Sequence, residues 1–115
     1  MAKEHNSSSL LYQFDIETEE EIMRTLAEQL RERRLEKGLS RGALAMMSGV
    51  PMATIAKFEQ KAQLSLRQYV ALCKALGYKD KLKDVMATPI YHTMEELEHI
   101  QKNQTRKHGR NQFSQ

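Results

Sequence analysis

The chain has very few cysteine, proline and aromatic residues. Its 115 residues include one Cys, two Pro and no Trp, and aromatic residues make up only 6% of the total. A single cysteine, Cys73, excludes an intramolecular disulfide and fits a reducing compartment. This composition is typical of small helical proteins rather than of β-sandwiches or barrels, and the length suits one small domain with tails. The sequence therefore favours an all-α fold.

Long apolar runs are also missing. The longest extends only from Ala43 to Met47, which is too short for a transmembrane helix or for the apolar part of a signal peptide. We therefore expect a cytoplasmic protein with no membrane partner.

Motifs for catalysis or metal binding are not found in the sequence. The four histidines have no metal-ligand spacing, since His92 and His99 are the nearest pair and lie on different predicted elements. No phosphate-binding loop or nucleophile elbow is present, and Glu95, Glu96 and Glu98 fit the start of a helix better than a catalytic pair. We expect no catalytic residue, no metal and no cofactor, and hence a protein that is not an enzyme.

Acidic and basic residues are separated along the chain. Residues 1–21 contain one Lys and six acidic residues. Residues 22–87 contain thirteen Lys and Arg and six acidic residues, and residues 88–115 contain four Lys and Arg and three acidic residues. A basic central segment fits a polyanion or an acidic partner, although a solvated surface explains the charge equally well.

Capping residues and glycines predict where helices begin and end. Capping-box spacing occurs in three pairs: Thr18 with Glu21, Ser65 with Gln68, and Thr93 with Glu96. Ser40 suits the N-cap of another helix. Gly38, Gly49 and Gly77 suit helix ends. With the apolar periodicity, these residues predict helices over about 19–37, 41–48, 51–59 with Pro51 at the first helical position, 66–76, 79–86 and 93–103. The inward faces are expected to carry Leu44 with Met47, Ile55 with Phe58, and Leu66, Tyr69, Val70, Cys73 and Leu76.

Three segments follow from this pattern. Residues 1–17 form a mostly flexible arm with an apolar patch of Leu10, Leu11, Tyr12, Phe14 and Ile16. Residues 18–87 form the domain, and residues 88–115 form a C-terminal helical extension with a flexible basic tail. From Gln104 the tail has several cations, one apolar residue and no acid, so we expect it to be disordered in isolation.

The segment from Gly38 to Gly77 has the pattern of a helix-turn-helix. A short helix, a glycine-containing turn and a second helix with an apolar inner face and a small or polar outer face follow one another. In this geometry the first helix holds the second at a steep angle, so that its N-terminal residues enter a DNA groove about 12 Å wide.

The residues themselves resemble the Cro/repressor-type helix-turn-helix (XRE) family over roughly residues 22–86. The resemblance is carried by Gly38-Leu39-Ser40, Leu44-Ala45, Ser48-Gly49-Val50, Thr54-Ile55-Ala56-Lys57-Phe58-Glu59, Leu66, Leu72 and Ala75-Leu76-Gly77. It implies a five-helix phage-repressor-like domain, with Ala45, Gly49, Ile55 and Leu72 as scaffold positions. It also implies that Glu59 ties the recognition helix to a basic residue of the first helix, for which Arg34 is the candidate.

The same resemblance implies a set of DNA-contacting residues. The base-facing residues are expected to be Pro51, Met52, Ala53, Ala56 and Lys57, and the phosphate-contacting residues Ser40, Arg41, Thr54, Gln60 and Lys61. Many relatives carry Gln, Ser or Arg at the base-facing positions, whereas Met52 and Ala53 offer mainly apolar contact to thymine methyl groups. Specificity is then expected to depend on Lys57, on DNA shape and on the arms.

The resemblance further implies double-stranded DNA as a partner and a homodimer on a near-palindromic operator with half-sites about 34 Å apart. The sequence leaves three dimer interfaces open: the helix predicted over 79–86, the Ile90-Tyr91 segment and the apolar N-terminal patch. The segment from Ala53 to Glu59 also looks like that of HipB-type antitoxins, which implies a HipA-like kinase toxin as a partner and repression of a shared operon. Two alternatives stay open, a stand-alone regulator and a helical adaptor that has lost DNA recognition.

Overall fold

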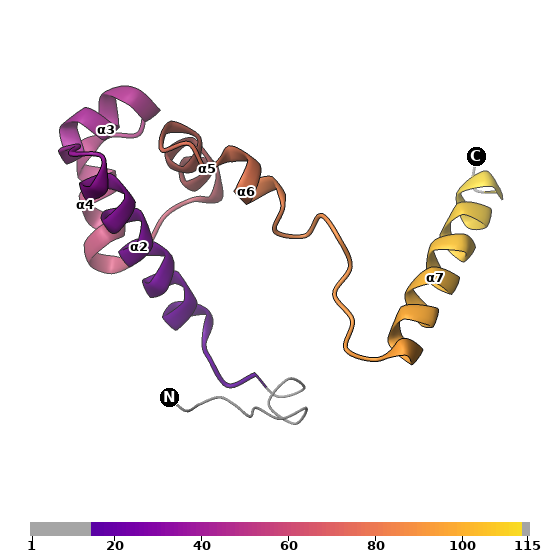
Figure 1. Cartoon of the computed structure of the whole chain (residues 1–115). Coiled ribbons are helices and arrows are strands. Elements are labelled where there is room, and N and C mark those ends of the chain that lie inside the picture. Colours follow the sequence, from indigo (N-terminus) through magenta and orange to yellow (C-terminus); the bar gives the residue numbers. More distant parts are fainter. Residues whose placement is uncertain (1–14, 114–115) are drawn as a thin grey trace. The chain divides into compact units, whose positions relative to one another are not determined.

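The structure, a computed structural model, describes residues 15–113, and for residues 107–113 it describes the backbone alone. The apolar patch predicted at Leu10, Leu11, Tyr12 and Phe14 lies outside the described residues, as does the end of the basic tail at residues 114–115. Within the described part every regular element is a helix, so the predicted all-α fold is confirmed (Figure 1). The elements are α2 (Glu19–Glu36), α3 (Arg41–Ser48), α4 (Met52–Lys61), α5 (Leu66–Ala75), α6 (Lys79–Lys83) and α7 (Met94–Phe113).

Local capping explains where most of these helices begin. The Thr18 hydroxyl accepts a hydrogen bond from the Glu21 amide at 3.0 Å, and the Glu21 carboxylate accepts one from the Thr18 amide at 2.9 Å, which completes a capping box. Ser65 caps α5 through the Gln68 amide at 3.1 Å. Each cap satisfies an amide that the first turn of a helix leaves without a partner.

The end of α7 corrects one expectation. The helix continues to Phe113, ten residues beyond the predicted end at Asn103, so the backbone from Gln104 to Phe113 is helical rather than disordered. Residues 102–107 are Lys, Asn, Gln, Thr, Arg and Lys, and this stretch has no proline and several good helix formers. The small number of apolar residues after Asn103 therefore did not predict the structure of this backbone correctly.

The core lies where α2, α3, α4 and α5 meet. Its largest fully buried side chains are Leu44, Ile55, Phe58 and Leu72, and the Phe58 ring packs edge-on against Tyr69 with ring centroids 6.0 Å apart. Cys73 is buried, as predicted.

Three side chains expected to face inward lie at the surface instead. Met47 is 54% exposed, Leu66 is 75% exposed, and Val70, inside α5, is 42% exposed. Met47 lies one residue from the end of the eight-residue α3, and Leu66 is the first residue of α5. Helix ends project beyond the core, so a periodicity that holds for whole helices overestimates burial there.

By proximity of Cα atoms the chain forms two compact units, one ending at Lys79 and the other beginning at Asp80. The sequence predicted that the domain ends at residue 87. The division in the structure instead falls at the start of α6, so most of α6 belongs to the C-terminal unit. The segment after α6 has turns, with the Ala87 amide bonded to the Asp84 carbonyl oxygen at 3.2 Å, and then no regular structure around Pro89.

Candidate nucleic-acid interface

The connection between α3 and α4 is a tight turn held by local interactions. Gly49 ends α3 in the left-handed region at φ 79°, and its amide bonds to the Ala45 carbonyl oxygen at 2.9 Å. The Val50 amide donates to the Ser48 hydroxyl at 3.1 Å, and the Val50 side chain is buried. Pro51 is the N-cap residue of α4, outside the helix rather than at its first position as predicted, and it makes no side-chain capping bond. The turn therefore fixes the direction in which α4 leaves α3.

The two sides of α4 have opposite characters. Its buried residues are Ile55, Phe58 and Glu59, which lie on one side of the helix. Ala53, Lys57 and Gln60 are all exposed, and their spacing of four and three residues places them in one row on the opposite side. This row is the outer face of α4.

The predicted base-facing residues are mostly accessible. Pro51, Met52, Ala53 and Lys57 are exposed, and Ala56 is half-buried. Met52 is 56% exposed, and its sulfur lies 3.6 Å from the position that a Cβ of Gly42 would occupy, so this side chain lies beside the first turn of α3. Lys57 is thus the one charged side chain that the base-facing set offers on this face.

The predicted phosphate-contacting residues divide between the ends of two helices. The Ser40 hydroxyl caps α3 by accepting from the Ala43 amide at 3.0 Å, so it is already engaged. Gln60 and Lys61 are exposed at the end of α4, and Thr54 is half-buried. Gln60 lies in the same row as Lys57, which puts it closer to the base-facing set than the sequence indicated.

An ion-pair network behind α4 confirms the predicted contact between Glu59 and Arg34. The Glu59 carboxylate, whose side chain is 1% exposed, accepts from Arg34 Nε at 2.8 Å and from Arg34 Nη2 at 3.0 Å. Arg34 Nη1 also donates to the Leu39 carbonyl oxygen at 2.8 Å. The network joins α2, α4 and the residue that leads into α3.

Arg41 adds a third hydrogen bond to the same carboxylate. Its Nε donates to Glu59 Oε1 at 3.0 Å, and its side chain is 35% exposed. The sequence predicted Arg41 only as a contact to DNA phosphate and did not predict its hydrogen bond to Glu59. No local pattern identifies it, because the two residues lie 18 positions apart.

The two guanidinium groups hold the Glu59 carboxyl in its charged form. Burial by itself raises its pKa, but the hydrogen bonds and positive charges of Arg34 and Arg41 outweigh burial, and the pKa lies below its ordinary value. One anion among two cations leaves a net positive charge beside the start of α3.

Arg24 is a second residue that the sequence did not identify. Its Nη1 donates to the carbonyl oxygens of Glu59 at 3.4 Å and Gln60 at 3.2 Å, in the last turn of α4. A cation at this position satisfies carbonyl groups that the end of a helix leaves free and complements the helix dipole. Both ends of the outer face of α4 are therefore fixed, one by the turn and one by Arg24.

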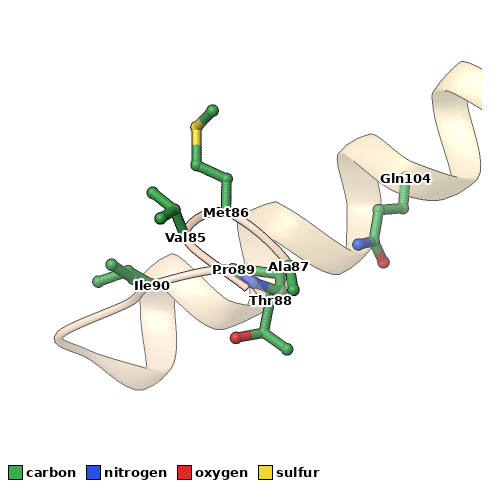
Figure 2. A pocket seen from close by; sticks show the side chains of 7 residues that line it. All are labelled: Val85, Met86, Ala87, Thr88, Pro89, Ile90 and Gln104. Carbon is green, nitrogen blue, oxygen red and sulfur yellow. The ribbon is translucent and has the colours of Figure 1, made fainter. Parts of the chain in front are cut away.

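The C-terminal unit offers a different kind of surface. Residues 85–90 and Gln104 line an open, mainly apolar hollow, with their side chains around the bend at Pro89 (Figure 2). Val85, Met86 and Ile90 are 67%, 90% and 77% exposed. Apolar exposure concentrated in one short segment is typical of an interaction surface.

Among residues 15–106, whose side chains the structure describes, no three His, Cys, Asp or Glu side chains are placed to hold a metal ion together. No helix among residues 15–113 is long and apolar enough to cross a membrane.

Helices α3 and α4 and the turn at Gly49 between them form a helix-turn-helix. Residues 30–81 match the family model described as Helix-turn-helix, which covers the end of α2, all of α3, α4 and α5, and the start of α6. The match supports an XRE-type, DNA-binding transcriptional regulator. Neither the curated proteins nor the solved structures include one that matches the chain.

Proposed function

We propose that the protein is a cytoplasmic, sequence-specific transcriptional repressor that binds a near-palindromic operator as a homodimer. The observation that carries the proposal is the outer face of α4, which is exposed while its inner face is fixed by the Glu59 ion pairs. A rigid helix with one free face suits insertion into the major groove.

The chemistry of this face suggests how operator bases are recognised. Lys57 donates to guanine O6 and N7 or to a nearby phosphate, and Met52 and Ala53 contact thymine methyl groups. These three side chains, Met52, Ala53 and Lys57, make few direct contacts with bases. Sequence-dependent DNA shape is therefore expected to contribute a large share of the specificity.

The homodimer follows from the size of the domain. One α4 contacts only one half-site, and two-fold symmetric proteins bind two half-sites about 34 Å apart. The exposed residues Val85, Met86 and Ile90 provide apolar surface for a second chain.

We further propose that the repressor is the antitoxin of a toxin–antitoxin operon with a HipA-like kinase toxin. This part depends on the resemblance of Ala53-Thr54-Ile55 and Phe58-Glu59 to HipB-type antitoxins. Co-expression with a kinase-like product of an adjacent reading frame tests it, since a stable complex on a sizing column is the expected result. A stand-alone repressor shows no such complex.

A helical adaptor is the second candidate function. It is favoured by Met52 and Ala53, which lack groups that hydrogen-bond to bases at the start of α4. An adaptor binds DNA only by general charge attraction, without preference for a sequence.

Fluorescence anisotropy with the DNA upstream of the reading frame tests the main proposal. The full chain is titrated at several salt concentrations against this duplex and a scrambled duplex, and Lys57→Ala is compared with Lys74→Ala. Lys74 is the matched control, since it is an exposed lysine on α5. We expect about a thousandfold preference for the upstream duplex, weakened in Lys57→Ala alone. Equal weak binding to both duplexes contradicts recognition of this site and favours the adaptor.

A further inference from the structure

Charge is distributed very unevenly along α7. Its first turns carry Glu95, Glu96 and Glu98, and no Asp or Glu follows Glu98 in the chain. Lys102 and Arg106 come next, and both are exposed. The second half of α7 is therefore purely cationic.

These two cations lie on one face without partners among the described residues. A separation of four residues places Lys102 and Arg106 on the same side of the helix, about 6 Å apart along its axis. Glu98 lies one turn before Lys102, yet no ion pair in the described part of the chain joins them, and Arg106 has no acid within one turn. In the sequence Arg110 follows at the same spacing.

Like charges one turn apart repel each other and weaken a helix. A polyanion that lies along this face removes the repulsion and releases counterions. Each strand of duplex DNA carries a phosphate every 3.4 Å or so along the axis, so a row of cations at about 6 Å spacing meets several phosphates. The face defined by Lys102 and Arg106 is called the cationic face of α7 below.

We propose that the cationic face of α7 binds the phosphate backbone of the DNA that flanks the operator half-site. The inference deepens the proposed function and rests on it, because α4 must first place the protein on its operator. It assigns to α7 a contact that the helix-turn-helix itself does not make.

A membrane surface fits this helix less well. The apolar residues of α7 are Met94, Leu97 and Ile100, which precede the cations, and Phe113 at the end of the helix. The turns that carry Lys102 and Arg106 present glutamine, asparagine and threonine on their other sides, so no continuous apolar face lies opposite the cations. Helices that lie in a membrane interface need a continuous apolar face opposite the cations. Duplex DNA needs only the charge.

The connection to the rest of the chain permits the contact. Residues 84–93 join α6 to α7, and ten residues span at most about 33–36 Å. This reach is close to one turn of B-DNA, about 34 Å. Because residues 84–86 form turns, the tether reaches less than this limit, so α7 can contact phosphates within about one turn of DNA from its attachment point.

Charge removal on the full-length protein tests the proposal. The variant Lys102→Gln/Arg106→Gln is compared with Lys81→Gln/Lys83→Gln, which removes two exposed cations from α6 instead. A third variant, Gln101→Lys/Lys102→Gln with Thr105→Arg/Arg106→Thr, keeps the net charge and rotates the cations by about 100° around the helix. Anisotropy is measured against salt on two operator duplexes, one ending at the half-sites and one extended by ten base pairs on each side. Far-UV circular dichroism checks the helix content of each variant.

We expect the wild type to bind the extended duplex about tenfold more tightly than the short one at moderate salt. The α7 charge-removal variant is expected to lose this advantage and to have a salt slope smaller by about 1.8, since each phosphate contact contributes about 0.9. The α6 variant is expected to keep the advantage, and the rotated variant to lose most of it.

Two results overturn the inference and leave the proposed function intact. One is equal binding of the wild type to both duplexes with unchanged affinity in the α7 variant. The other is binding to vesicles of phosphatidylserine and phosphatidylcholine that the α7 charge removal abolishes while DNA binding persists. If instead the wild type prefers neither operator duplex over scrambled DNA, the proposed function itself fails.

Discussion

Arg34 of α2 and Glu59 of α4 form a bidentate ion pair, although the two residues lie far apart in sequence. Arg34 Nε donates to Glu59 Oε2 at 2.8 Å and Nη2 donates to Oε1 at 3.0 Å, across 25 positions of the chain. The geometry is the parallel pair of hydrogen bonds in which a guanidinium and a carboxylate match best. Because the pair joins α2 to the inner face of α4, the orientation of the outer face of α4 depends on it.

We expect Glu59→Gln to lower the free energy of unfolding by about 3–5 kcal/mol. The substitution leaves the Arg34 guanidinium, 7% exposed, buried without a countercharge. Urea unfolding followed by circular dichroism measures the change. In the control Arg34→Met/Glu59→Met both charges are removed, and most of the loss is expected to be recovered. A loss below about 1 kcal/mol in Glu59→Gln would mean that the pair stabilises little.

Acid should destabilise the domain through the same carboxyl. Its pKa in the folded state lies below the ordinary value of 4.5, because Arg34 and Arg41 outweigh the effect of burial. The stabilisation is therefore complete above pH 4.5 and is lost as the pH falls through the lower folded pKa. Thermal melts from about pH 7 to pH 2.5 are expected to show a steeper fall in Tm below pH 4.5 for the wild type than for Glu59→Gln. Parallel curves for the two proteins would contradict this origin.

Local features of the fold were predictable from the sequence. The capping bonds of Thr18, Ser40, Ser65 and Thr93 each join residues three positions apart, so a short pattern contains all the information. The contact between Arg34 and Glu59 was also predicted, but from a family resemblance rather than from spacing.

The tertiary contacts of two other arginines were not predicted. Arg41 contacts Glu59, and Arg24 contacts the carbonyl oxygens of Glu59 and Gln60, across 18 to 36 positions. An arginine reaches such partners from several backbone positions, so spacing does not single it out. Burial of Met47 and Leu66 was overestimated because apolar spacing does not show where a helix end projects beyond the core.

The turn residue Gly49 gives a prediction that depends on backbone geometry alone. Its φ is 79°, and a Cβ built on it would have no atom within 4 Å. We expect Gly49→Ala to destabilise the domain by about 1–2 kcal/mol through strain in the left-handed region. Gly42 is the control, since it lies inside α3 with no positive φ and its added Cβ would have an ordinary 3.6 Å contact to Met52 Sδ. Gly42→Ala should stabilise by up to about 1 kcal/mol in the same urea experiment. Equal effects of the two variants would refute the backbone explanation.

Cys73 should react slowly with thiol reagents while the protein is folded. Burial raises the pKa of its thiol above the ordinary 9.0, and the hydrogen bond with Tyr69 offsets only part of the increase. Since the thiolate is the nucleophile, both low access and a raised pKa reduce the rate. A colorimetric disulfide reagent at about pH 8 is expected to label the native chain far more slowly than the urea-unfolded chain. Rapid labelling of the native chain would show that α5 opens readily.

Arg41 is expected to affect DNA binding and stability to different extents. Its Nε bonds to Glu59, while 35% of the side chain is exposed at the start of α3. We expect Arg41→Gln to lower operator affinity about tenfold and the salt slope by about 0.9, as for one lost phosphate contact. The cost in stability should be only about 1 kcal/mol, because Arg34 still neutralises Glu59. Arg41→Lys keeps the charge but not the planar guanidinium, so its salt slope should stay near that of the wild type while its affinity falls less. Anisotropy and urea unfolding on the same three proteins measure both effects. An unchanged salt slope in Arg41→Gln would show that Arg41 supports the fold and does not contact phosphate.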